Sequence, residues 1–220
     1  PQAPVIVVLI SGNGSNLQAL IDAVAAGQIT AKIAAVISND PSAKGLQRAR
    51  DAGIQCQAID HKNYSPRELF DAQLIRAIDT YQPELIVLAG FMRILSNDFV
   101  RRYEGKLLNI HPSLLPKYPG LNTHQRAIDS QDKVHGVTTH FVTSELDSGP
   151  NIIQAEVPVL ENDTAEKLAH RVQQQEYVIY PITVKWFIEG RLKMEGDLAY
   201  LDHEALPDSG LRLDSPHTLH

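Results

Sequence analysis

Short apolar runs alternate with helix-like segments along the first half of the chain. Val5–Ile10 and Leu85–Gly90 are apolar and rich in β-branched residues, which is typical of buried strands. Further strands are predicted at Ile33–Ser38, Ile54–Ile59 and Leu107–His111. Helical spacing of apolar side chains predicts helices at residues 17–27, 43–52, 66–78 and 97–103. This order predicts βαβ units and a parallel sheet with right-handed crossovers.

The pattern changes after residue 130. Val137–Val142 and Ile152–Val159 are strand-like, and the turn-rich TSELDSGP between them is too short for a parallel crossover. These two strands are therefore predicted to be antiparallel. A D-x-x-E capping box at Asp163 and Glu166 precedes a long helix, within which Pro181 predicts a kink or a division. The buried side of this helix is predicted at Leu168, Val172, Ile179 and Trp186.

The chain is thus predicted to have an α/β, Rossmann-like fold with a mostly parallel sheet and an antiparallel C-terminal portion. Residues 1–206 are predicted to form a single domain, with LKM and AYL as short edge strands, and the polar residues 207–220 a loose tail. With 220 residues, 43% of them hydrophobic, the chain is long enough for one domain with a proper core.

Charge and cysteine content narrow the function classes. A net charge of -6 argues against general nucleic-acid binding, which needs a basic surface. Cys56 is the only cysteine, so the chain has no internal disulfide, and a reducing compartment, by default the cytoplasm, is expected. No apolar run approaches the roughly 18 residues that span a bilayer, and the N-terminus lacks the basic residues of a signal peptide. We therefore expect no membrane or nucleic-acid partner.

The stretch SGNGSN lies between the first strand and the first helix. Glycines there let the backbone approach a ligand, and a helix N-terminus favours an anion. A dinucleotide fingerprint would need a third glycine where Leu17 stands, although Asp40 is placed to bind a ribose. A tight structural turn, a monophosphate site and a dinucleotide site all remain open on this evidence.

The strand Leu107–His111 ends in two polar residues, in the sequence LLNIHPSLLPKYPG. Residues two apart in a strand face the same side, so Asn109 and His111 point together near a carboxyl end, where α/β sheets bind ligands. Asn offers a neutral donor to an oxyanion, and His exchanges a proton near neutral pH. The alternative is a pair that merely satisfies loop carbonyls. The chain has no G-x-S-x-G motif, so no serine nucleophile is expected. The spacings of four histidines match no usual zinc pattern, so no metal is expected; they are His111, His124, His135 and His140.

Five segments resemble the folate-dependent formyltransferases. They are VVLISGNGSNLQA, VLAGFMRILS, LLNIHPSLLPKYPGLNTH, HGVTTHFVTSELDSGP and RVQQQEYVIYP, and together they reach from about Val5 to Lys193. NIHPSLLP with a downstream DSGP loop is typical of the family, and GNGSN narrows the resemblance to its glycinamide ribonucleotide branch. Asn122 departs from the GLHTH of many bacterial members and is not taken as catalytic.

The resemblance implies a formyltransferase fold and a direct reaction. The formyl group of the co-substrate 10-formyltetrahydrofolate would pass to the amine of glycinamide ribonucleotide, in de novo purine biosynthesis, without a covalent enzyme intermediate. It further implies that Asn109 and protonated His111 stabilise the oxyanion of a tetrahedral intermediate. Asp147 would favour the imidazolium form of His111 and help to relay the proton. From spacing alone, Asp147 is better explained as a turn residue before Ser148 and Gly149, and its combination with NIHPS favours the catalytic role instead.

Substrate residues are also implied by the resemblance. The N-terminal half would bind the nucleotide phosphate and the C-terminal half the folate. Residues expected at glycinamide ribonucleotide are Gly12, Asn13, Gly14, Ser15, Asn16 and, at the ribose, Glu176. Residues expected at the folate are Arg67, Met92, Arg93, Ile94, Leu95, Asn109, Val142, Thr143, Ser144, Glu145, Leu146 and Asp147. A monomer or a homodimer is expected.

Four alternatives stay open. A formyltetrahydrofolate hydrolase would carry an extra N-terminal domain, whereas here Pro1 lies four residues before the first strand. A methionyl-tRNA formyltransferase would carry a C-terminal nucleic-acid domain, for which 220 residues of acidic balance leave no room. An oxidoreductase would use the Gly12 turn for a dinucleotide, and a non-catalytic module would only bind a nucleotide. An assay with 10-formyltetrahydrofolate and glycinamide ribonucleotide separates these four functions.

Overall fold

The computed structural model describes residues 2–213 of the chain, which form two compact units that meet between Asn109 and Ile110. Unit 1 is the part before this boundary, and unit 2 is the part after it. The boundary falls within the strand β5. The sequence predicts a single domain with two functional halves. Unit 1 consists of β1 (Val5–Ile10), α1 (Ser15–Ala25), β2 (Lys32–Ser38), α2 (Gly45–Asp51), β3 (Gln55–Ala58), η1 (His61–Asn63), α3 (Arg67–Asp79), β4 (Leu85–Leu88), α4 (Asn97–Arg102) and the start of β5 (Leu107–His111).

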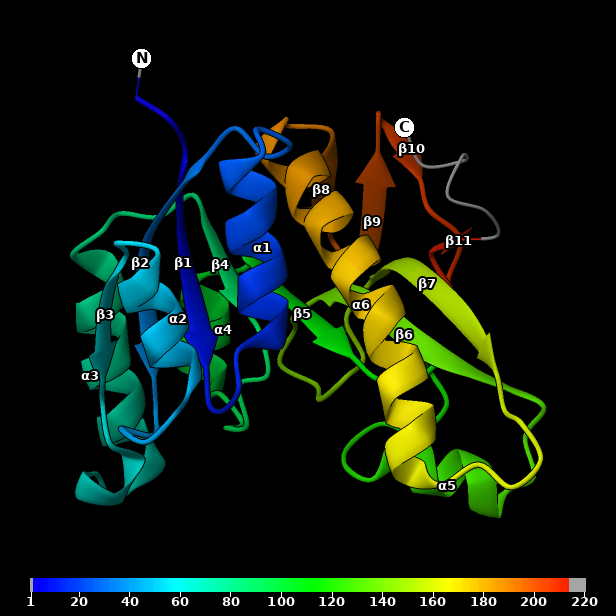
Figure 1. Ribbon diagram of the computed structural model, residues 1–220. Helices are drawn as coiled ribbons and strands as arrows, with labels where there is room; N and C mark the ends of the chain where they lie inside the picture. The colour runs from blue at the N-terminus through cyan, green and yellow to red at the C-terminus, as the bar shows by residue number, and fades with distance from the viewer. Residues whose placement is uncertain (1, 214–220) are drawn as a thin grey trace. The chain divides into compact units, whose positions relative to one another are not determined.

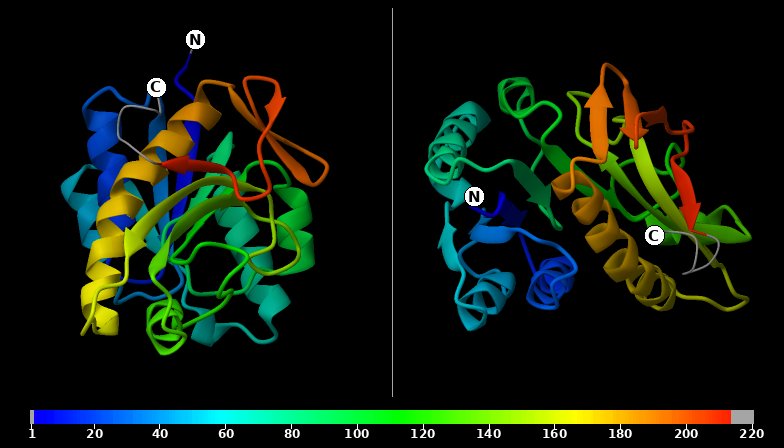
Figure 2. Two further views of the ribbon diagram at one scale, coloured as in Figure 1. Left: turned by 90° about the vertical axis from the view of Figure 1, so that its right-hand side faces the viewer. Right: turned by 90° about the horizontal axis from the view of Figure 1, so that it is seen from above.

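The strands of unit 1 form a parallel sheet in the order β5-β4-β1-β2-β3, as the alternation of elements predicts. Every residue of β4 is buried, because α1 and α2 cover one face of the sheet while α3 and α4 cover the other (Figures 1 and 2). Parallel strands advance in one direction, so the loops after β1, β4 and β5 leave the sheet at the same edge. That edge carries SGNGSN, the segment after β4 and the end of β5.

Unit 2 continues with α5 (Thr123–Asp129), β6 (Val134–Phe141), β7 (Asn151–Pro158), α6 (Ala165–Ile188), β8 (Leu192–Glu195), β9 (Leu198–Leu201), β10 (Glu204–Ala205) and β11 (Leu211–Leu213). β6 and β7 pair antiparallel, which confirms the predicted antiparallel portion. α6 packs against both strands (Figure 1). The predicted buried residues of this helix all lie in the core: Leu168, Val172, Ile179 and Trp186.

The start of α6 differs from the predicted capping box. Thr164 is the N-cap, and its hydroxyl accepts the N–H of Lys167 at 3.2 Å. Asp163 instead accepts the N–H of Leu160 and two hydrogen bonds from Arg171, at 2.8 and 3.0 Å. Those hydrogen bonds from Arg171 lower the pKa of the Asp163 carboxyl to about 2. The prediction was wrong because Arg171, eight residues or about two helical turns further along the chain, binds the carboxylate.

Two further predictions are corrected at the C-terminal end. Pro181 does not divide α6, which is one helix from Ala165 to Ile188, so of the predicted kink or division the division was wrong. The prediction of a loose tail was wrong for Leu211–Leu213, which form β11 and pair in parallel with β7. Residues 214–220 of the predicted tail lie outside the described residues. The predicted edge strands at LKM and AYL are β8 and β9, which pair with each other in a separate small sheet.

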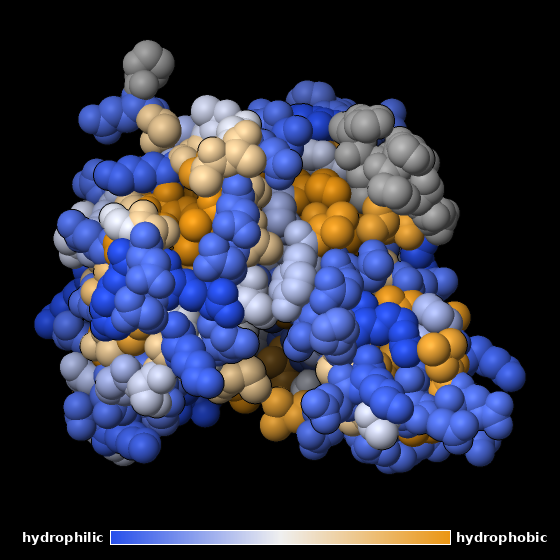
Figure 3. Space-filling model, viewed as in Figure 1, coloured by the Kyte–Doolittle hydropathy of each residue, from blue (hydrophilic) through white to orange (hydrophobic). Residues whose placement is uncertain are grey.

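The surface is mainly polar on the face that Figure 3 displays, with apolar areas between the hydrophilic side chains. Nine large apolar side chains are exposed in the described chain, including Met92, Ile94, Leu121 and Leu146. Within residues 2–213, no helix combines the length and the apolar character needed to cross a bilayer.

Candidate active site

The end of β5 carries the predicted pair of polar residues. Leu107, Leu108 and Ile110 of this strand are buried in the core, while Asn109 is half-buried. Strand alternation sets Asn109 and His111 on one side of β5. The backbone of β5 is held by its parallel register with β4, in which Val87 is opposite Leu108. The two side chains are therefore positioned by a rigid strand and not by a flexible loop.

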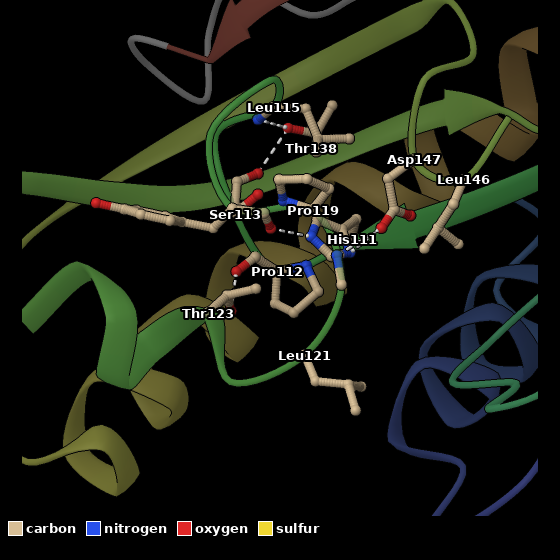
Figure 4. Close-up of polar contacts among 12 residues, drawn as sticks. His111, Pro112, Ser113, Leu115, Pro119, Leu121, Thr123, Thr138, Leu146 and Asp147 are labelled. Atoms are coloured by element: carbon tan, nitrogen blue, oxygen red, sulfur yellow. Dashed lines mark hydrogen bonds and ion pairs between the residues drawn. The ribbon is translucent and has the colours of Figure 1, made fainter.

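His111 lies between two oxygen acceptors (Figure 4). Its Nε2 is 2.7 Å from the carbonyl oxygen of Tyr118, and its Nδ1 is 3.6 Å from Oδ2 of Asp147. The side chains of His111 and Asp147 are 8% and 6% exposed. A neutral imidazole has a single N–H, whereas an imidazolium has two. The carbonyl of Tyr118 can only accept, so Nε2 carries a proton, while Nδ1 faces the Asp147 carboxylate at ion-pair distance.

The loop that follows β5 explains the proline-punctuated stretch of the sequence. Thr138 of β6 donates its hydroxyl to Ser113 O at 2.7 Å and accepts the N–H of Leu115 at 3.1 Å. Ser113 in turn donates its hydroxyl to Lys117 O, and Thr123 donates to Pro112 O, both at 2.5 Å (Figure 4). These bonds fix the loop, so that the Tyr118 carbonyl is held against His111.

Two residues beside His111 adopt left-handed backbone conformations. Tyr118 has φ 52° and Asp147 has φ 50°. Such values are uncommon for residues other than glycine, and Asn and Asp tolerate them best. The N–H of Gly120 donates to Asp147 Oδ2 at 2.9 Å, which fixes the carboxylate that faces His111. The roles of the Tyr118 carbonyl and the Gly120 N–H were not predicted, because no local sequence signal indicates a backbone contact with a side chain 7 or 27 residues away.

A second histidine approaches the same carboxylate. His140 is buried in β6, and its Nε2 lies 4.0 Å from Asp147 Oδ1. Its Nδ1 is 2.9 Å from the carbonyl oxygen of Phe141. Burial lowers the pKa of His140, so this ring is neutral at pH 7. Asp147 thus contacts one histidine held neutral by burial and another, His111, with acceptors at both nitrogens.

A pair of histidines lies close behind the loop. His124 Nδ1 and His135 Nε2 are 3.1 Å apart, with the two rings perpendicular. Burial and the neighbouring His124 lower the pKa of His135 to about 4. Among the described residues, no group of three His, Cys, Asp or Glu side chains is arranged to hold a metal ion. His124 and His135 are therefore two neutral rings that share one hydrogen bond.

The SGNGSN loop of unit 1 is shaped by a close approach of two backbones. Gly14 is the N-cap of α1, with φ 76°, and no side chain caps this helix. A Cβ on Gly14 would lie 2.7 Å from the Cα of Gly45, and the Gly45 N–H donates to Gly12 O at 2.9 Å. The first turn of α1 therefore presents its N–H groups to the space before the helix, as anion sites do.

Arg48 of α2 braces the same loop. Its Nε donates to the Asn13 carbonyl at 2.8 Å and its Nη2 to Asn13 Oδ1 at 3.0 Å. Gly12 has open space around its Cα, since a Cβ built there meets nothing within 4 Å. Ser15 and Asn16 begin α1, with Asn16 buried. The five predicted phosphate-loop residues, Gly12–Asn16, thus lie together in one loop and the first turn of α1. Arg48 and Gly45 also contact this loop, and sequence spacing does not reveal these two contacts.

The segment after β4 contains the residues predicted to receive the folate. Met92 and Ile94 are 66% and 55% exposed, an unusual display of apolar side chains next to the buried β4. The guanidinium of Arg93 lies over the Phe70 ring, 5.2 Å from its centroid. Arg67 is exposed as the first residue of α3. Exposed apolar side chains of this kind suit a flat heteroaromatic ligand.

The remaining predicted residues lie in unit 2. Val142–Asp147 form the loop between β6 and β7, with Ser144, Glu145 and Leu146 exposed. Glu176 is buried in the middle of α6. A buried carboxylate on a helix is rare unless it has a partner or a function.

Comparison with known proteins decides the family. The formyl transferase family model matches residues 5–184. The phosphoribosylglycinamide formyltransferase of Escherichia coli is 54% identical over 209 residues, covering 95% of this chain and 99% of that protein. The chain belongs to the formyl transferase family. The match spans both compact units, and it includes all the residues singled out above.

Solved structures and longer relatives agree with this membership. The phosphoribosylglycinamide formyltransferase structure from Coxiella burnetii is 48% identical, with a TM-score of 0.92, covering 96% of this chain and 99% of that one. The human trifunctional purine biosynthetic protein adenosine-3 is 41% identical over 201 residues, which cover 90% of this chain and 20% of that protein. The predicted α/β formyltransferase fold is therefore confirmed.

Proposed function

We propose that this chain transfers the formyl group of 10-formyltetrahydrofolate to the amine of glycinamide ribonucleotide, in de novo purine biosynthesis. The products are N-formylglycinamide ribonucleotide and tetrahydrofolate. Membership of the formyl transferase family supports the reaction type, and the names of the relatives support the acceptor. The observation that carries the proposal is the buried His111–Asp147 pair, with an acceptor at each imidazole nitrogen.

The chemistry needs three things from the protein. The substrate amine attacks the formyl carbon, whose oxygen becomes an oxyanion. The amine then loses a proton, the folate nitrogen gains one, and the bond between that nitrogen and the formyl carbon breaks. In this proposal the Asn109 amide and the His111 imidazolium donate to the oxyanion. Asp147 holds His111 in its charged form and relays the proton between the two nitrogens.

Two loops of unit 1 would serve the two substrates. The nucleotide phosphate would accept hydrogen bonds from the N–H groups of Gly12–Asn16 at the start of α1. A local dipole of this kind can hold a dianion on a chain whose net charge is -6. The pterin would lie against the exposed apolar side chains and backbone groups of Met92–Leu95, and Arg67 would contact a folate carboxylate. In unit 2, Glu176 would bind the ribose hydroxyls, and Val142–Asp147 would contact the folate.

The proposal also covers the cellular compartment and the oligomeric state of the enzyme. A single cysteine fits a reducing compartment, for which the cytoplasm is the default. We propose a monomer or a homodimer, which light scattering on the purified protein would distinguish.

One experiment tests the function against its alternatives. The purified chain is mixed with 10-formyltetrahydrofolate and glycinamide ribonucleotide, the folate absorbance is followed, and the nucleotide product is identified by mass spectrometry. Formylated nucleotide that appears in step with tetrahydrofolate is the expected result. Release of formate without the nucleotide would mean a hydrolase. Transfer to methionyl-tRNA but not to the nucleotide would mean another formyltransferase. No turnover with either acceptor would refute the proposal.

A further inference from the structure

The hydroxyl of Ser11 connects two loops of unit 1. Ser11 immediately follows β1 and precedes the Gly12–Asn16 loop. Its Oγ accepts the N–H of Met92, the first residue of the exposed segment after β4, at 2.7 Å. The backbone N–H of Ser11 donates to Gly90 O at 3.1 Å. One residue at the root of the SGNGSN loop thus holds the start of the Met92–Leu95 segment through both its backbone and its side chain.

Asn39 orients this hydroxyl. Ser11 Oγ donates its hydrogen to Asn39 Oδ1 at 2.5 Å, and Asn39 is 5% exposed at the end of β2. A serine hydroxyl has one hydrogen, so a bond to Asn39 turns the oxygen lone pairs toward the N–H of Met92. The contact with Met92 therefore has a defined direction, and an apolar side chain of the same size would leave both Asn39 and Met92 without this partner.

The far end of the exposed segment is anchored separately. Asp71 of α3 accepts the N–H of Ser96 at 2.7 Å, and the Ser96 hydroxyl accepts the N–H of Phe99 at the start of α4. Arg93, between the two ends, stacks on Phe70 of the same helix. The C-terminal end of the segment is thus tied to α3 and α4, while its N-terminal end is tied to the SGNGSN loop through Ser11.

We propose that Ser11 is a positioning residue that couples nucleotide binding to folate binding. The proposal rests on the assignment above of Gly12–Asn16 to the nucleotide phosphate and of Met92–Leu95 to the folate. Binding of the phosphate orders the loop that begins at Ser11 and, through its hydroxyl, the N–H of Met92. Ser11 itself contacts neither reacting atom. Its effect is that each substrate binds more tightly when the other is present, and by the same factor.

The test measures this coupling directly. The affinity of tetrahydrofolate, the product folate, is measured by calorimetry with and without saturating glycinamide ribonucleotide. For the wild type we expect an increase of about fivefold or more, the low end of usual coupling between sites. In Ser11→Ala the ratio should fall toward one, and in Ser11→Thr, which keeps the hydroxyl, it should recover. Ser42→Ala makes the same change at an exposed serine of the same unit and should leave the ratio unaltered.

A second readout does not depend on the stability of the alanine variant. Glycinamide ribonucleotide alone should slow amide hydrogen exchange at Met92 in the wild type. A wild-type ratio of one, an unchanged ratio in a folded Ser11→Ala variant, or unaltered Met92 exchange would each overturn the coupling. Formyl transfer by the wild type is assayed in parallel. Its absence would refute the proposed function, whereas its presence with no coupling would refute only the role of Ser11.

Discussion

The loops that follow β1 and β5 solve two different problems with two different sets of residues. The loop after β1 uses glycine, so that backbone N–H groups at the start of α1 are uncovered and α2 can approach closely. The loop after β5 is rich in proline and is fixed by Thr138 and Thr123, whose hydroxyls donate to the carbonyl oxygens of Ser113 and Pro112. It holds the buried His111 against the carbonyl oxygen of Tyr118. The first loop offers fixed dipoles, and the second offers groups that gain and lose protons.

This difference shows how binding and chemistry place different demands on a fold. A phosphate keeps its charge throughout the proposed reaction, so backbone dipoles suffice to hold it. The formyl oxygen gains charge only in the transition state, so the groups that meet it must be preorganised and able to change protonation. Substitutions after β1 should therefore affect substrate affinity, and substitutions around β5 should affect kcat.

The largest expected effect is that of Asp147→Asn. Asn can still accept the N–H of Gly120 and tolerates φ 50°, so the turn should survive. The negative charge beside His111 is lost, and with it the proposed proton relay. We expect kcat to fall about 10²–10⁴-fold, the usual range for a general acid–base group.

Steady-state kinetics, thermal unfolding and an NMR titration of His111 check this prediction together. A near-wild-type kcat with an unmoved His111 titration would leave Asp147 as a turn residue and would remove the contrast between the two loops.

Asn109→Ala should have the next largest effect. Its amide would meet an oxyanion that exists only after attack, so the loss should appear in kcat, by about 10²–10³-fold, with little change in either KM. Asn109→Asp is the matched variant, since it keeps the shape but replaces a donor with an acceptor. A defect confined to the KM for folate would show that Asn109 only positions that substrate.

Local patterns predicted the elements and the polar pair at the end of β5, because alternation and strand ends are properties of adjacent residues. Contacts between distant residues were beyond such patterns. The hydrogen bond from Gly120 to Asp147 and the approach of Gly45 to Gly14 exist only because separate parts of the chain pack together. Asp163 was mistaken for a cap because its partner, Arg171, lies eight residues away. Resemblance to a family supplied the role of Asp147, which spacing alone left as a turn residue.

Gly12→Ala and Gly14→Ala should separate binding from folding in the loop after β1. A Cβ at Gly12 meets nothing within 4 Å, so Gly12→Ala should unfold like the wild type but raise the KM for the nucleotide about tenfold by crowding the phosphate. Gly14 has φ 76°, and its Cβ would lie 2.7 Å from Gly45 Cα, so Gly14→Ala should cost about 1–3 kcal/mol of folding free energy.

Urea unfolding and nucleotide KM measurements on both glycine variants check this pair. Equal KM values for Gly12→Ala and the wild type would argue that the phosphate does not lie against this loop.

The smallest expected effect is a pH dependence of stability that arises behind the loop after β5. The pKa of His135 is lowered to about 4 from 6.5 by burial, with Asp132 opposing the effect and His124, His111 and Lys117 adding to it. Between pH 6.5 and 4 the unfolded chain binds a proton at this residue that the folded chain does not. The free energy of unfolding should therefore fall as the pH falls through this window, by about 2 kcal/mol after allowing for solvent screening.

His135→Gln tests this source of pH dependence. Glutamine cannot titrate, so the variant should be less stable than the wild type at pH 8 but should lose less stability between pH 6.5 and 4. His170→Gln, at an exposed position of α6, applies the same change as a control. The measurement is urea unfolding at pH 8, 6.5, 5 and 4. Parallel pH profiles for wild type and His135→Gln would show that the loss of stability at acid pH comes from other groups. The loop after β5 would then resemble the loop after β1, in that no histidine packed behind it affects the pH dependence of unfolding.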